Sequence, residues 1–200
     1  MQNYILKEYQ KTKDLFDKIL HDKKLLLKIE EVTNVCYESL KDGGKIMFCG
    51  NGCSAADSQH MAAELVSKLC YDRPALNAIA LTTDTSALTA IGNDYGYIYS
   101  FSRQIEAIAK EGDVLIWIST SGRSKNILEA IKSAKNKKVI TVGFLGEDGR
   151  DVGKLVDHQI NIPSNETPKI QEGHIATGNI ICASIEDKFF GKTHNPNNKI

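Results

Sequence analysis

The chain has 200 residues, of which 42% are hydrophobic, and its 25 lysine and arginine residues balance 25 aspartate and glutamate residues. This length predicts one domain with a full core, and the zero net charge argues against a surface that attracts nucleic acid or an anionic membrane. The five cysteines lack Cys-x-x-Cys spacing, and no apolar run is long enough to span a bilayer, so we expect a cytoplasmic protein without a disulfide framework.

Two amphipathic helices open the chain. Apolar residues recur at helical intervals over 5–21, and a fuller stripe over 25–40 stops at a pair of glycines, a common signal for a helix C-terminus. The first helix precedes any strand, so its apolar side has no evident partner in its own domain. We therefore expect residues 1–42 to lie in an interface between copies of the chain. At the other end, the Asn- and Lys-rich tail over 192–200 is expected to be flexible.

Short apolar runs then alternate with helical patterns along the chain. The runs lie at 45–49, 76–81, 114–119, 139–144 and 159–162. This rhythm predicts an α/β fold with a five-stranded parallel sheet and helices on both faces. Such sheets bind their ligands beyond the carboxyl ends of the strands, so the loops at those ends are the expected place of the site.

The first of these loops leads from an apolar run into a helix. It carries Asn51, Gly52 and Cys53. A helix N-terminus offers unpaired N–H groups, which suit an anion or a polar sugar. Further into the same helix, His60 and Glu64 are four residues apart and share one face. This spacing is typical of metal ligands or of an acid–base pair, although surface pairs of this kind are also common. A dinucleotide site is disfavoured because no acidic residue follows at the required distance.

Two further loops carry polar side chains. The strand at 114–119 runs into four hydroxyl residues, which are Ser119, Thr120, Ser121 and Ser124. Hydroxyl and N–H groups before a helix form a compact phosphate cradle, although the same residues are ordinary turn and capping residues. The loop over 82–95 starts a short helix that ends near Asn93 and Asp94. Either side chain can hydrogen-bond a polyol or simply form a turn.

The last helix is predicted over 168–190, with Pro168 at its start and Gly191 at its end. Polar residues gather in its first half, namely Gln171, Glu172, His174 and Asn179. They form either a second wall of the site or the solvated end of a helix whose second half is apolar.

Five segments of this sequence together resemble the phosphoheptose isomerases, a family of sugar isomerase (SIS) domain proteins. The segments are 50–64, 80–86, 90–96, 118–122 and 168–174, in the family's order. The resemblance implies a flavodoxin-like three-layer α/β/α SIS domain over 1–200, with extra N-terminal helices, and a homotetramer. It also implies conversion of sedoheptulose 7-phosphate to D-glycero-D-manno-heptose 7-phosphate through an enediol, in heptose biosynthesis for lipopolysaccharide or capsule.

The resemblance also implies a role for each matching residue. The phosphate would lie on Ser119, Thr120, Ser121 and Ser124. The sugar would contact Asn51, Gly52, Cys53, Glu64, Asn93, Asp94 and Gln171. One zinc ion per subunit would be held at His60, Glu64, Gln171 and Asn179. Glu64 and the residue at position 179 would move the proton between C1 and C2.

Two positions depart from the family's pattern. Asn179 stands where the isomerases have a histidine, and Cys53 stands where they usually have glycine. An amide does not exchange a proton near neutral pH, and its oxygen is a poorer zinc ligand than imidazole. His174, three residues after Gln171, is the obvious substitute ligand. The Cys53 side chain either crowds the sugar or becomes a reactive thiolate at the helix N-terminus.

Asparagine at position 179 also raises a second reading of the chain. The DnaA initiator-associating proteins, another SIS family of tetramers, carry asparagine there, but they lose the glutamate and alter the Ser-Thr-Ser loop. This chain keeps Glu64 and the run from Ser119 to Ser121. The sequence therefore favours the isomerase, and a tetrameric scaffold that binds without turnover is the alternative.

Overall fold

The structure is a computed structural model that describes residues 1–70 and 72–191; the tail predicted to be flexible lies outside these residues. The elements in chain order are α1 (Gln2–His21), α2 (Lys23–Lys41), β1 (Ile46–Gly50), α3 (Cys53–Val66), β2 (Ala78–Ala80), α4 (Thr85–Asp94), the 3₁₀ helix η1 (Tyr97–Tyr99), α5 (Ser102–Ile108), β3 (Val114–Ile118), α6 (Lys125–Asn136), β4 (Ile140–Leu145), α7 (Arg150–Gly153), β5 (His158–Asn161) and α8 (Thr167–Phe190). None of the helices in these residues is long and apolar enough to cross a bilayer.

The five strands form one parallel sheet in the order β2-β1-β3-β4-β5. This confirms the predicted sheet, with an edge strand β2 that is shorter than the apolar run suggested. Strands β1 and β3 are neighbours, although β2 lies between them in the sequence. The strand order therefore reverses at this pair, and ligands of open α/β sheets bind at such a switch point.

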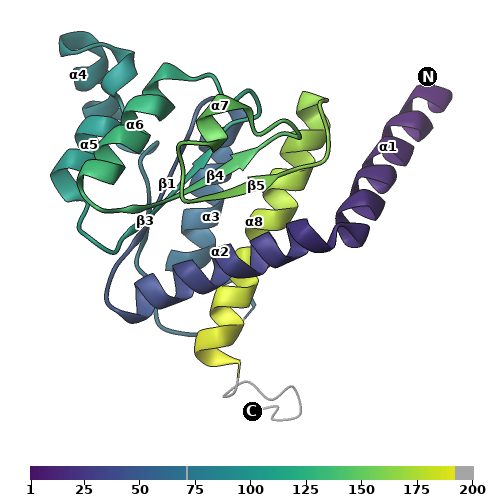
Figure 1. The fold of residues 1–200 in the computed structure, drawn as a ribbon, viewed down its shortest axis with the longest axis horizontal. Helices are drawn as coiled ribbons and strands as arrows, with labels where there is room; N and C mark the ends of the chain where they lie inside the picture. Colours follow the sequence, from purple (N-terminus) through teal and green to yellow (C-terminus); the bar gives the residue numbers. More distant parts are fainter. Residues whose placement is uncertain (71, 192–200) are drawn as a thin grey trace.

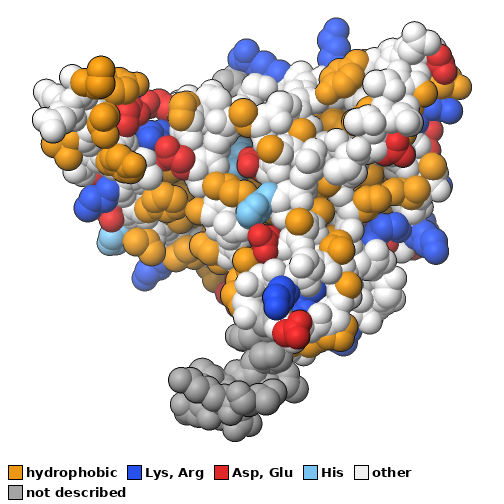
Figure 2. Space-filling view, turned by 180° about the vertical axis from the view of Figure 1, so that it is seen from behind, with side chains coloured by type: hydrophobic (Ala, Val, Ile, Leu, Met, Phe, Trp, Pro, Cys, Tyr) orange, Lys and Arg blue, Asp and Glu red, His pale blue; other side chains and the backbone are white. Residues whose placement is uncertain are grey.

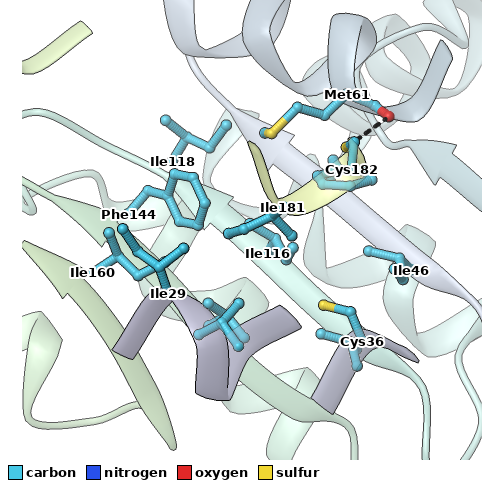
Figure 3. Close-up of a cluster of buried hydrophobic side chains, with 14 of the residues drawn as sticks. Ile29, Cys36, Ile46, Met61, Ile116, Ile118, Phe144, Ile160, Ile181 and Cys182 are labelled. Carbon is cyan, nitrogen blue, oxygen red and sulfur yellow. Dashed lines mark hydrogen bonds between the residues drawn. The ribbon is translucent and has the colours of Figure 1, made fainter. Parts of the chain in front are cut away.

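Helices cover both faces of the sheet (Figure 1), so the three-layer α/β/α sandwich is confirmed. Side chains of a strand point alternately to the two faces, and each inner strand therefore feeds two cores. On one face Ile46, Ile116 and Phe144 pack against side chains of α2, α3 and α8, as Figure 3 shows. On the other face Met47 and Trp117 pack against α5 and α6.

The first helix is only half covered by its own domain. Its C-terminal half buries Leu15 and Ile19 in the core beneath α2 and α8. This corrects the expectation that its apolar side has no partner in the domain. Its N-terminal half leaves Tyr4, Leu6 and Tyr9 exposed, and hydrophobic side chains gather at this end of the molecule in Figure 2. In this half of α1 the apolar side chains are exposed and do not pack on the rest of the domain.

Helices α3 and α8, on the same face of the sheet, pack against each other. A Cβ atom on Gly178 of α8 would stand 2.3 Å from Sδ of Met61 on α3, so a side chain there would displace the Met61 side chain from its place. The buried side chains of Arg73 and Glu186 form an ion pair, with 2.9 Å between Nε and Oε1, which ties the segment after α3 to α8. Arg73 also donates to the backbone carbonyl of Glu64 at 2.8 Å. These contacts fix how the polar residues of α3 and α8 face each other.

Candidate active site

The two predicted binding loops lie side by side at the carboxyl edge of the sheet. Strand β1 ends at Gly50 and β3 at Ile118, and these two residues are register partners. Each strand is followed by a short loop and then by a helix of more than eight residues, α3 or α6. The N-termini of both helices therefore point their free N–H groups at the same edge.

The loop after β1 turns sharply into α3. A Cβ atom on Gly50 would stand 2.6 Å from the carbonyl oxygen of Ser54, so the helix begins directly over the strand end and only glycine fits. Gly52, with a φ of 58°, adopts a left-handed conformation that favours glycine. This turn leaves Gly52 and Cys53 exposed at the helix N-terminus.

The loop after β3 presents the predicted hydroxyl groups. Ser119 accepts a hydrogen bond from the Gly122 amide at 3.0 Å, which shapes the loop, and its hydroxyl hydrogen is free to donate. Ser124 precedes α6 without a side-chain capping bond. Two of the hydroxyl residues also line a cavity of about 150 Å³, whose walls include Thr120, Ser121, Gly146, Glu147, Asn165 and Thr167.

Three of the four predicted metal ligands meet between α3 and α8. Nε2 of His60 lies 2.9 Å from Oδ1 of Asn179 and 3.5 Å from Oε1 of Glu64. The side chain of His60 is 43% exposed and that of Glu64 is 21% exposed, so solvent and small molecules reach this cluster. Gly178, the residue before Asn179, packs against Met61 of α3, so α8 contacts α3 next to the position that supplies the third side chain.

The fourth predicted ligand, Gln171, lies apart from these three in the same chain. It precedes Asn179 by eight residues of α8, which is about 12 Å along a helix axis. No hydrogen bond within the described ranges of the chain links Gln171 to His60, Glu64 or Asn179. Within one chain, Gln171 and Asn179 therefore belong to different parts of the helix surface.

His174 is a core residue and not the substitute ligand that its spacing suggested. It is 1% exposed, its Nε2 donates to the carbonyl oxygen of Leu145 at 3.1 Å, and its ring packs against Phe144. Burial lowers the pKa of His174 to about 4, so the imidazole is neutral near pH 7. Three helical residues turn the side chain by about 60° from that of Gln171, and here that rotation points it at the sheet.

The predicted sugar contacts Asn93 and Asp94 lie at the end of α4. Asn93 Nδ2 donates to Asp94 Oδ1 at 2.7 Å, and both residues are exposed. Figure 1 places α4 at the side of the molecule away from α1. Among the described residues, no hydrogen bond links this pair to His60, Glu64 or Asn179, so one copy of the chain does not bring the two groups into contact.

Asp57 is a further candidate residue that the sequence analysis did not single out. It precedes His60 by one helical turn, and its Oδ2 is buried without a hydrogen-bond partner in the described part of the chain. Burial raises the pKa of this carboxyl group, and the charge of His60 opposes the rise. A half-buried, unpaired carboxyl group beside an imidazole is suited to hold a proton. Its spacing of three residues from His60 was the available signal.

The distances between the donor atoms around His60 suit a small cation, whereas the types of donor atom suit it only partly. Ligand atoms of a tetrahedral zinc site stand about 3.3 Å apart, since each lies about 2.0 to 2.1 Å from the metal. The two distances at His60 are close to this value. However, the described residues hold no group of three His, Cys, Asp or Glu side chains that could bind a metal, because the third donor here is an amide oxygen. His60 and Glu64 are thus the principal candidate ligands, with Asn179 as a weak third.

The chain is similar to known proteins over nearly its whole length. Residues 9–146 match the family model of the SIS domain. The phosphoheptose isomerases of Burkholderia pseudomallei and Aneurinibacillus thermoaerophilus are each 50% identical to the chain, over 94% and 95% of its length and 96% of their own. The solved phosphoheptose isomerase of Neisseria gonorrhoeae is 38% identical, with a TM-score of 0.86 over 93% of this chain and 98% of that one. The one from Francisella tularensis is 30% identical, with a TM-score of 0.89 over the same shares.

Proposed function

The chain belongs to the SIS domain family, among the phosphoheptose isomerases, and we propose that it converts sedoheptulose 7-phosphate to D-glycero-D-manno-heptose 7-phosphate. Its similarity to these proteins over nearly its whole length makes it an aldose–ketose isomerase. The observation that supports the particular reaction is the hydroxyl-rich loop before α6, which lies beside the start of α3, the helix that carries Glu64, at the carboxyl edge of the sheet. A phosphate held on the α6 loop anchors one end of the sugar, so that C1 and C2 meet a proton-transfer group.

In this mechanism Glu64 carries the proton between the two carbons. Its carboxylate removes a proton from one carbon and delivers it to the neighbouring carbon of a cis-enediol. Asn179 has no exchangeable proton to offer, and its Oδ1 instead orients the imidazole of His60. His60 and Asp57 then hold the proton that moves between the two sugar oxygens. His60 and Glu64 would hold a zinc ion, whose chemistry here would be to polarise the sugar carbonyl.

The assembly and the pathway are part of the same proposal. A homotetramer would cover the exposed half of α1 and the whole of α4, neither of which packs fully on its own domain. In such an assembly Gln171, which makes no hydrogen bond with His60 among the described residues of one chain, would come to this cluster from a second copy. The product would enter heptose biosynthesis for lipopolysaccharide or capsule.

An isomerase assay on the purified, zinc-loaded protein tests this function. The product formed from sedoheptulose 7-phosphate is identified by NMR, with and without added zinc. Appearance of the aldose supports the proposal. Asn179 is the observation that favours the scaffold instead, and binding of the ketose without any turnover would establish that alternative.

Replacing Ser119 and Ser121 together by alanine should weaken binding of the phosphorylated sugar by well over tenfold. Hydrogen bonds to a charged group contribute roughly 1.5 to 3 kcal/mol each, and this variant removes two hydroxyl donors. Calorimetric titration measures the affinity. Ser67→Ala, at an exposed serine beyond the end of α3, is the matched control and should leave it unchanged. An unaltered affinity in the double variant would show that the phosphate binds elsewhere.

A further inference from the structure

We infer that Asn126 is a positioning residue, which orients the Asn51 amide so that this amide donates a hydrogen bond to the sugar. The inference rests on the proposed function, in which Asn51 contacts the substrate. Asn126 is the second residue of α6 and is only 4% exposed. Neither Asn126 nor its partners Tyr97 and Ser100 stood out in the sequence.

The two asparagine amides pair with each other in both directions. Nδ2 of Asn51 donates to Oδ1 of Asn126 at 2.9 Å, and Nδ2 of Asn126 donates to Oδ1 of Asn51 at 2.9 Å. The second hydrogen on Nδ2 of Asn126 goes to the hydroxyl oxygen of Ser100 at 3.1 Å. Asn126 therefore has no donor left for a ligand and lies beneath Asn51, so it acts on the substrate only through Asn51.

The same bonds determine what Asn51 can offer to the sugar. Its Oδ1 accepts from Asn126 and from the Tyr97 hydroxyl, at 2.8 Å, which uses both lone pairs. One hydrogen on its Nδ2 is bound to Asn126, and the other has no acceptor among residues 1–70 and 72–191. The free hydrogen makes Asn51 a donor, so its partner on the substrate is an acceptor oxygen and not a hydroxyl hydrogen.

This network also joins the two halves of the site. Asn51 belongs to the loop after β1, whereas Asn126 follows directly on the Ser119–Ser124 loop, two residues after Ser124. The amide pair therefore sets the separation between the sugar-binding loop and the proposed phosphate loop. Anchoring a substrate at its phosphate raises the reaction rate only if the reacting carbons are also held at the proton-transfer group. A small displacement of these carbons lowers the rate by a large factor.

A double-mutant cycle between Asn126→Ala and Asn51→Ala tests the inference. Loss of Asn126 leaves the Asn51 amide free to rotate, and we expect kcat/KM for sedoheptulose 7-phosphate to fall about tenfold, the factor that one oriented hydrogen bond of about 1.4 kcal/mol supplies. In an Asn51→Ala background the same substitution should change kcat/KM less than twofold. The affinity for inorganic phosphate should stay unchanged, because Asn126 does not contact the anion.

Two further variants keep the test decisive. Tyr97→Phe removes only a hydroxyl from an exposed ring, so it folds even if Asn126→Ala does not, and its effect should likewise vanish in the Asn51→Ala background. Asn136→Ala, at the exposed end of the same helix, is the control and should behave as the native protein. Losses from Asn126→Ala or Tyr97→Phe that persist at full size without Asn51 would overturn the inference.

The outcome stays separable from that of the proposed function. A native protein that binds the ketose without turning it over contradicts the isomerase, and the cycle is then measured on the Kd of the ketose, with the same pattern expected. A protein that neither turns over nor binds this sugar overturns both proposals.

Discussion

Replacing Asn179 by histidine is expected to raise zinc affinity and to increase turnover of sedoheptulose 7-phosphate, by up to the 10² to 10⁴-fold that a positioned acid–base group typically contributes. Asn179 already lies 2.9 Å from Nε2 of His60, so an imidazole there enters the existing cluster. It replaces a weak amide ligand with a strong one and adds a group that exchanges protons near pH 7. Turnover of both forms in excess zinc, together with metal analysis, measures the effect.

The result for Asn179→His separates three kinds of protein. An isomerase weakened at one position gains strongly. An isomerase adapted to asparagine already turns over and gains little, because His60 and Asp57 already move the proton between the two sugar oxygens. A scaffold shows no turnover in either form, although the fold is intact by circular dichroism, and this outcome would overturn the proposed function.

The second large effect is expected at Glu64. Glu64→Gln keeps the size of the side chain and removes its ability to accept a proton, so kcat should fall by about 10² to 10⁴-fold. Folding should be little affected, because the contact that fixes this position is made by the backbone carbonyl of Glu64 to Arg73. Steady-state kinetics and thermal unfolding of the variant check both statements.

A matched control substitution tests whether the fall in kcat of Glu64→Gln comes from the loss of proton transfer. Glu38→Gln removes a carboxylate of the same kind from an exposed pair with Lys41, in which such a contact contributes little. It should retain native kcat. If Glu64→Gln also kept native kcat, Glu64 would not be the group that moves the proton.

The fold could be predicted because its signals are local. The apolar runs and the glycines that end them predicted a parallel sheet of five strands, and their alternation with helices predicted the layers. The cover of α1 was predicted less well, because the burial of Leu15 and Ile19 depends on where α8 packs. A helical stripe indicates that one side is covered but does not indicate by which element.

The site was predictable only where the spacing along one helix decides the contact. His60 and Glu64 were found in this way, whereas the partnership of Asn51 with Asn126 joins residues 75 positions apart. Spacing misled at His174, because a helical offset gives an angle relative to Gln171 and not the direction of the core. Asp57 is a candidate because its carboxyl group is buried, and Tyr97 is one because its hydroxyl group contacts Asn51. Neither property can be read from a sequence motif.

Helix α4 has no buried side chain, and this has a consequence for its dynamics. A helix whose main tertiary contact is the partly buried Leu88 opens by local unfolding at little cost in free energy. Its backbone amides should therefore exchange with deuterium far faster than those of the central strands. If assembly covers the helix, exchange in Thr85–Asp94 should slow as protein concentration rises, while exchange in Val114–Ile118 stays constant. Deuterium uptake of this one segment would then report the fraction of assembled protein, and with it the ordering of Asn93 and Asp94.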